Sequence, residues 1–116
     1  MQKSLLLLSA LLIFVVFSCS KDGDDDPIDE NVDCSTLDVT YTDEIKGIID
    51  ANCALPACHG GNATLPDFTN YDNVFARRSL IQSRVVSRSM PPAGSPDLSS
   101  EHIEIINCWV QNGAPE

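Results

Sequence analysis

Apolar and polar residues divide the chain into three stretches with different physical properties. Residues 5–17 are almost all apolar, residues 20–33 carry seven acidic residues against one lysine, and from Cys34 onward apolar residues recur in short clusters. Where these clusters are spaced three or four residues apart, their side chains share one face of an α-helix. We therefore expect one folded helical domain over residues 34–116, preceded by segments outside its core.

Four helical segments are expected in this domain. Thr42, Thr69 and Ser99 can each cap the start of a helix with a side-chain oxygen, and a further short helix is expected over residues 79–87. No stretch alternates as a β-strand does, so the predicted fold class is a small all-α domain. At helical spacing these segments carry Ile45, Ile48, Ile49, Tyr71, Val74, Phe75, Leu80, Ile81, Val85, Val86, Ile103, Ile106, Trp109 and Val110.

The first part of the chain has the features of an export signal. Lys3 precedes an apolar run that is too short to cross the roughly 30 Å core of a bilayer, which favours a signal peptide over residues 1–18. The end of the run, "VFSC", resembles the lipobox of bacterial lipoproteins, in which the cysteine, here Cys19, becomes the lipidated N-terminus. An ordinary signal peptide with an incidental Cys19 is the alternative.

Residues 19–33 are expected to form a flexible acidic tether, because they contain too few apolar residues to bury. The segment also resembles the export tag of some lipoproteins on the outer face of the outer membrane, although a plain spacer is equally compatible with it. The chain is thus expected to be an exported bacterial lipoprotein of the outer membrane, facing the periplasm or the cell surface. Its formal net charge of −10 and lack of a basic patch exclude nucleic acid as a partner.

The cysteines indicate how the small domain is held together. In an oxidising compartment free thiols rarely persist, so all four cysteines after Cys19 should be bonded to something. If Cys53 and Cys58 hold one group together, Cys34 and Cys108 remain to form a disulfide near the two ends of the domain. Such a bridge stabilises a domain by about 2–4 kcal/mol.

The stretch "CALPACH" carries the candidate chemistry. Covalent haem attachment needs two thiols, which form thioethers with the porphyrin vinyl groups, and a following imidazole that binds the iron. Cys53, Cys58 and His59 supply these groups, with four residues between the cysteines where the usual motif has two. The extra residues must bulge out of the turn, which Pro56 favours because proline disfavours the helical conformation of the residue before it.

A second iron ligand is available in the segment "SRSMPPAG". Met90 precedes two prolines, which suits a rigid strap passing over one face of a cofactor, although a lone methionine is more often core filler. Imidazole and thioether together fill both axial positions of the iron and raise its potential, a combination that favours electron transfer. His102 is an alternative distal ligand. Arg77, Arg78, Arg84 and Arg88 could pair with haem propionates, because a guanidinium group suits a carboxylate. More often such arginines form a solvated helix face, and none of the four is assigned to the site.

Two other interpretations of the same residues remain open. Cys53 and Cys58 could form a disulfide in a haem-free binding or structural module at the cell surface. Alternatively, Cys53, Cys58, His59 and Cys108 could form a structural zinc site, which is plausible by ligand type but disfavoured in an oxidising compartment.

The order of these parts resembles a class I cytochrome c, in which a helix, the haem motif, middle helices, a Met-Pro loop and a C-terminal helix follow one another. The layout "NCA…CHG…MPP.G…LS…I..I..W…GAP" is similar to that of small, planctomycete-type cytochrome domains in lipoproteins, over Ile45 to Pro115. The resemblance implies one covalently bound haem c, with Cys53 and Cys58 on its vinyl groups, His59 as proximal and Met90 as distal ligand. It further implies a membrane-anchored electron carrier that is not an enzyme and that serves redox partner proteins or a surface or periplasmic enzyme complex.

Overall fold

Helices and the loops between them make up the part of the chain that the computed structural model describes, residues 32–61 and 64–116. No strand occurs in these residues, so the predicted all-α class is confirmed. The predicted signal peptide, the lipidation of Cys19 and all of the tether before Val32 lie outside them. The elements are a 3₁₀ turn η1 (Cys34–Thr36), a π-helical turn η2 (Tyr41–Ile45), and the α-helices α1 (Lys46–Asn52), α2 (Tyr71–Ala76), α3 (Arg78–Val86) and α4 (Ser100–Gln111).

The first helix begins earlier than its predicted cap. The Thr40 side chain accepts a hydrogen bond from the Asp43 backbone N–H at 3.2 Å, and Glu44 Oε2 accepts one from the Thr40 N–H at 2.9 Å. Thr40 is therefore the N-cap, and the prediction of Thr42 is wrong. The reciprocal bonds satisfy two backbone donors at the start of η2, as in a capping box.

The other two predicted caps have different outcomes. Asn70, and not Thr69, caps α2, because its side-chain oxygen accepts the Asn73 N–H at 3.0 Å. Ser99 caps α4 as predicted, accepting the His102 N–H at 3.2 Å. The predicted helix at 79–87 corresponds to α3, which begins one residue earlier and ends one residue sooner.

The core lies where α4 packs against η2 and α3, with buried residues of α1 beside them. Trp109 and Ile106 are fully buried, and Tyr41 lies beside Trp109 with ring centroids 6.3 Å apart. Most of the predicted apolar positions are buried here, but Leu80 and Val86 are exposed. The buried core residues are Val39, Tyr41, Ile45, Ile48, Ile49, Phe68, Val74, Ile81, Val85, Leu98, Ile103, Ile106, Trp109 and Ala114.

A disulfide and several hydrogen bonds join the two ends of the domain. Cys34 in η1 and Cys108 in α4 form a disulfide across a sequence separation of 74 residues, which confirms the predicted pairing. Close by, the Asn112 side-chain amide donates to the carbonyl oxygens of Cys34 and Leu37. Pro115 adds two further hydrogen bonds, because its carbonyl oxygen accepts from the Tyr41 backbone N–H and from the Trp109 indole N–H.

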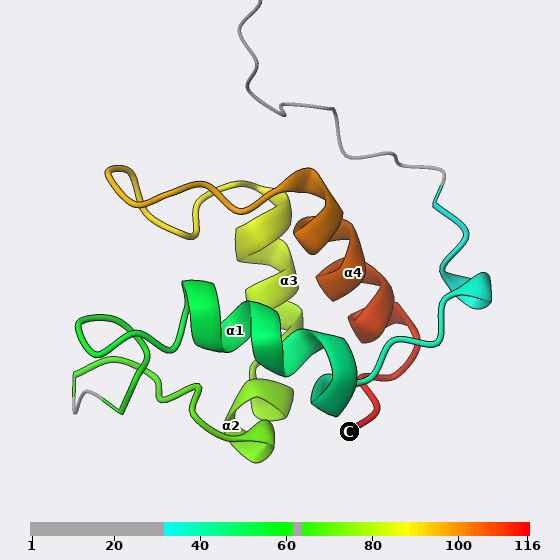
Figure 1. Ribbon diagram of the computed structural model, residues 1–116, viewed down its shortest axis with the longest axis horizontal. Helices are drawn as coiled ribbons and strands as arrows, with labels where there is room; N and C mark the ends of the chain where they lie inside the picture. The colour runs from blue at the N-terminus through cyan, green and yellow to red at the C-terminus, as the bar shows by residue number, and fades with distance from the viewer. Residues whose placement is uncertain (1–31, 62–63) are drawn as a thin grey trace, which may run out of the picture.

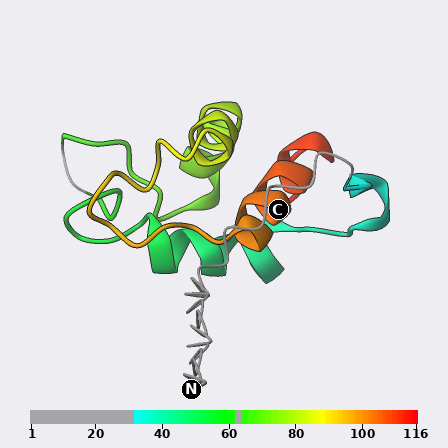
Figure 2. The same ribbon diagram turned by 90° about the horizontal axis from the view of Figure 1, so that it is seen from above.

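This arrangement leaves two loops projecting from the helices on the same side. The loop after α1 and the loop between α3 and α4 lie together at the left of Figure 1, away from the disulfide-linked end. The view from above in Figure 2 places both loops again on the side opposite α4. None of the helices in the described residues has the length and apolar content needed to cross a membrane.

Candidate functional site

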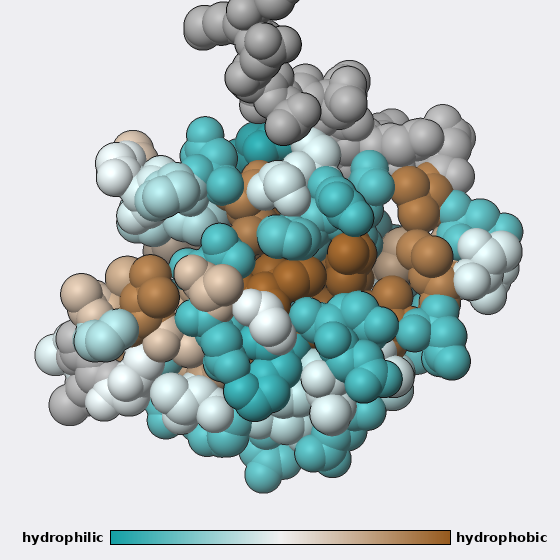
Figure 3. All heavy atoms as spheres, in the orientation of Figure 1, coloured by the Kyte–Doolittle hydropathy of each residue, from teal (hydrophilic) through white to brown (hydrophobic). Residues whose placement is uncertain are grey.

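An apolar cavity of about 490 Å³ lies between the two projecting loops and α3. In Figure 3, apolar side chains in tan and brown lie among hydrophilic ones at the left of the molecule, where the two loops project. The loop after α1 forms one wall, the Met90 loop the opposite wall, and α3 the side. The lining residues are Ala51, Asn52, Cys53, Leu55, Ala57, Cys58, His59, Leu65, Pro66, Phe68, Arg77, Leu80, Ile81, Arg84, Val85, Met90, Pro91, Pro92, Ser95 and Pro96.

One face of α3 and its cap supplies the side of the cavity. The lining positions 77, 80, 81, 84 and 85 follow the spacing of a single helical face. This explains why Leu80 is 54% exposed although it lies at helical spacing from buried residues, since its side chain lines the cavity and not the core. Leu55 and Leu65 are exposed for the same reason. Apolar residues of this kind around a hollow indicate a ligand site.

The stretch from Cys53 to His59 forms a tight turn at the end of α1. The Cys58 N–H donates to the Leu55 carbonyl oxygen at 2.8 Å, and the His59 N–H donates to the Cys53 carbonyl oxygen at 3.0 Å. Leu55 and Pro56 are both exposed in this turn, Leu55 on the side of the cavity that it lines. The turn therefore brings Cys53 and Cys58 to the same cavity in spite of the long spacer.

Gly60 makes the close approach in this turn possible. Its N–H donates to the Leu55 carbonyl oxygen at 3.0 Å. A Cβ atom at this position would lie 2.7 Å from the same oxygen and 2.8 Å from that of Ala54. Because real Cβ atoms do not approach backbone oxygens so closely, only glycine fits here without a shift of the backbone.

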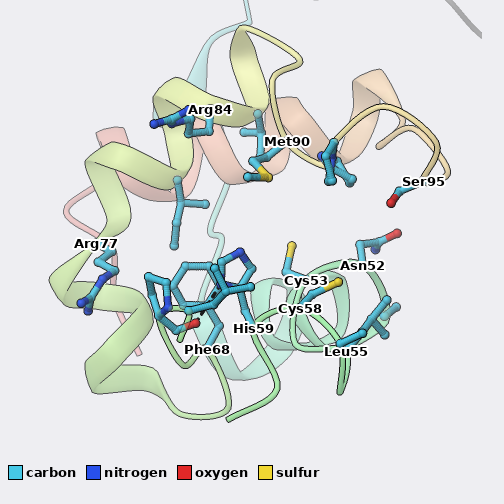
Figure 4. A pocket seen from close by; sticks show the side chains of 18 of the residues that line it. Asn52, Cys53, Leu55, Cys58, His59, Phe68, Arg77, Arg84, Met90 and Ser95 are labelled. Atoms are coloured by element: carbon cyan, nitrogen blue, oxygen red, sulfur yellow. Dashed lines mark hydrogen bonds between the residues drawn. The ribbon is translucent and has the colours of Figure 1, made fainter. Parts of the chain in front are cut away.

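Cys53 and Cys58 are free thiols in the structure, so the alternative disulfide between them is not formed there. Burial, and to a smaller extent the neighbouring Cys58, raises the pKa of the Cys53 thiol to about 11. Cys53 is thus protonated at neutral pH, which makes it a weak nucleophile. Figure 4 places both sulfur atoms beside His59, on the wall of the cavity opposite Met90.

The His59 ring is held in a defined orientation. Nδ1 lies 2.8 Å from the carbonyl oxygen of Pro66, and Phe68 stacks on the ring with centroids 4.2 Å apart and an interplanar angle of 23°. A carbonyl oxygen only accepts hydrogen bonds, so this contact favours the proton on Nδ1. The lone pair of a neutral ring is then on Nε2, the form in which imidazole binds a metal.

Met90 lies across the cavity from His59. Figure 4 shows its thioether at one wall and the imidazole at the other, with the hollow between them. The N–H groups of Ser89 and Met90 both donate to the Arg84 carbonyl oxygen, at 3.0 and 3.2 Å, so the loop turns directly off the end of α3. The structure thus brings together Cys53, Cys58, His59 and Met90, the residues selected from the sequence.

The remaining ligand predictions have different outcomes. The zinc site made of Cys53, Cys58, His59 and Cys108 is wrong, because Cys108 is bonded to Cys34 and buried in the core. In the described part of the chain no group of three or more His, Cys, Asp or Glu side chains is placed to hold a metal ion. His102 lies on α4 and does not line the cavity.

Sequence analysis missed several residues of the site. Pro66 and Phe68, which orient His59, lie in a loop without a recognisable motif. The cavity-lining face of α3 has one signal in the sequence. Arg77 and Arg84 recur at helical spacing on the same face as the apolar residues Leu80, Ile81 and Val85.

Comparisons of the chain with protein-family models, with curated proteins and with solved structures find no significant match.

Proposed function

We propose that this protein is a mono-haem c-type cytochrome of the class I type, anchored to a membrane by a lipid on Cys19 and acting in electron transfer. The observation that carries the proposal is the placement of His59 and Met90 on opposite walls of one apolar cavity, with Cys53 and Cys58 lining it as well. A single covalently bound iron porphyrin would use all four of these groups at once.

The residues present fit haem c in size and in chemistry. The cavity of about 490 Å³ lies within the range of about 300–1,000 Å³ that is typical of small-molecule and cofactor sites. Its walls are mainly apolar, as the flat faces of a porphyrin require. His59 has the tautomer that metal binding needs, because Pro66 accepts the hydrogen bond from Nδ1.

Each residue then has a distinct role. Cys53 and Cys58 would form the thioethers, while His59 Nε2 and the Met90 sulfur would bind the iron from its two sides. A bound haem supplies one-electron redox chemistry, and an axial His–Met pair favours a high potential. If His59 and Met90 both bind the iron, no position would be left on it for a substrate, and the protein would act as an electron carrier and not as an enzyme.

The proposed partners follow from this role. An electron carrier on a lipid anchor serves redox proteins within reach of its tether, in the periplasm or at the cell surface of a bacterium. The acidic composition of residues 20–33, with seven acids against one lysine, suits a solvated tether of this kind.

The test is expression of the full chain in a bacterial host with the haem-attachment machinery, followed by purification from the membrane fraction. We expect a reduced-minus-oxidised haem spectrum and a chromophore that stays with the polypeptide on a denaturing gel. Cys53→Ala/Cys58→Ala should abolish the retained colour, whereas the matched pair Cys34→Ala/Cys108→Ala should keep it. Colourless native protein with Cys53 and Cys58 joined in a disulfide would overturn the proposal in favour of a haem-free module.

A further inference from the structure

The charged residues in the cavity wall are of one sign. Among the described residues that line it, Arg77 and Arg84 are charged, and no Asp or Glu accompanies them. The chain as a whole has seven Lys and Arg against 17 Asp and Glu. A cavity wall whose only charged residues are positive therefore differs from the average composition of the chain. A ligand with negative charge on the α3 side of the cavity is the natural complement of such a wall.

These two arginines differ from the other arginines of the domain. The Arg78 side chain lies 4.0 Å from the centre of the Phe75 ring and donates to the Phe75 carbonyl oxygen, and Arg88 bonds to Leu98 and Ser100. Within the part of the chain that the structure describes, the guanidinium groups of Arg77 and Arg84 have no hydrogen bond or ion pair. Both side chains are exposed, so these two groups are available to a ligand.

Their position relative to the cysteines specifies which part of a haem they would meet. Figure 4 shows Arg77 and Arg84 on the α3 side of the cavity, with Cys53 and Cys58 on the other side. The vinyl groups and the two propionates of an iron porphyrin lie on opposite halves of the ring. A haem joined to Cys53 and Cys58 would therefore direct its propionates toward α3.

We propose that Arg77 and Arg84 are the propionate-binding residues of this cavity, one for each carboxylate or both as a shared clamp. The inference rests on the proposed function and selects two of the domain's four arginines, a choice that the sequence alone did not allow. The two arginines are about two helical turns apart on one face, which allows them to reach two separate carboxylates. The planar guanidinium suits a carboxylate because it can donate two parallel hydrogen bonds.

The experiment compares Arg77→Gln, Arg84→Gln and the double variant with Arg78→Gln in the full-length, haem-loaded protein. Arg78→Gln is the matched control, because it removes the same charge from the same helix but not from the cavity wall. The two readouts are the midpoint potential and the propionate bending modes in the resonance Raman spectrum. Removing a positive charge near the iron disfavours the added electron, so the potential should fall in both single variants and further in the double variant.

Lysine substitutions separate charge from hydrogen-bond geometry. Arg77→Lys/Arg84→Lys should restore most of the potential while the propionate modes stay shifted, since lysine keeps the charge but cannot donate in parallel. Potentials and propionate modes in the Gln variants equal to those of Arg78→Gln would overturn the inference while leaving the proposed function intact. A wild-type protein without attached haem would instead reject the proposed function, and this inference with it. If the double variant does not accumulate, the two single variants decide the question.

Discussion

The guanidinium of Arg88 is hydrogen-bonded to the hydroxyl of Ser100, with 2.8 Å between Nη2 and Oγ. Arg88 lies two residues before Met90, and Ser100 is the first residue of α4. A second, longer contact of 3.4 Å joins Arg88 Nη1 to the Leu98 carbonyl oxygen. One side chain thus connects the start of the Met90 loop to its end. The Arg88 backbone has a φ of 53°, a left-handed conformation that suits glycine better than arginine.

Substitutions at Arg88 should separate these two features. Arg88→Ala loses the hydrogen bonds and keeps the unfavourable backbone, so we expect the free energy of unfolding to fall by about 2 kcal/mol. Arg88→Gly loses the same bonds but relieves the backbone, and it should be about 1 kcal/mol more stable than the alanine variant. Urea denaturation of the two variants and the wild type measures both differences. An alanine variant as stable as the glycine variant would show that the backbone conformation costs nothing there.

A pair of glycine substitutions tests the turn that carries the cysteines. Gly60→Ala places a Cβ atom 2.7 Å from the Leu55 carbonyl oxygen, so the turn must open and the yield of covalently attached haem should drop. Gly47→Ala is the control, because its Cβ would meet nothing within 4 Å in α1, and it should stabilise the domain by about 0.5–1 kcal/mol. Haem staining against total protein gives the yield. Equal yields in both variants would contradict the requirement for glycine at position 60.

The sequence predicted the helices well and their starts less well, for a physical reason. Thr40 and Thr42 are both good caps by residue type. The earlier start is favoured by tertiary contacts of Tyr41, whose ring packs on Tyr71 at 5.2 Å and whose N–H donates to the Pro115 carbonyl oxygen. Partners 30 and 74 positions away cannot be read from a local pattern.

The residues of the candidate site were likewise predicted only in part from the sequence. Cys53, Cys58, His59 and Met90 could be selected because their side chains carry chemistry and their neighbours restrict the backbone. Leu80 was assigned with the core residues around it, since helical spacing shows that residues share a face but not what covers that face. Only the folded arrangement reveals that this face of α3 lines a cavity.

Removing the disulfide should lower stability without affecting the cavity. The Cys34–Cys108 bridge closes a loop of 74 residues, for which the chain-entropy model gives about 4 kcal/mol. We expect Cys34→Ala/Cys108→Ala to lose about this amount in denaturant unfolding and to retain the haem spectrum, because neither residue lines the cavity. Treating the wild type with a reductant should reproduce the loss of stability. A changed haem spectrum in the double variant would show that the disulfide-linked end of the domain influences the cavity.

Replacing Met90 tests the distal side of the proposed haem site. Met90→Ala should lower the midpoint potential, because the thioether favours the reduced iron, and should leave a position at which carbon monoxide or imidazole binds. Leu55→Ala is the control, since Leu55 is 40% exposed in the same cavity, against 38% for Met90, but carries no donor atom. It should change the potential little and admit no added ligand. If Met90→Ala behaves like Leu55→Ala while His102→Ala opens the position, the distal ligand is His102, and the loop between α3 and α4 has another role.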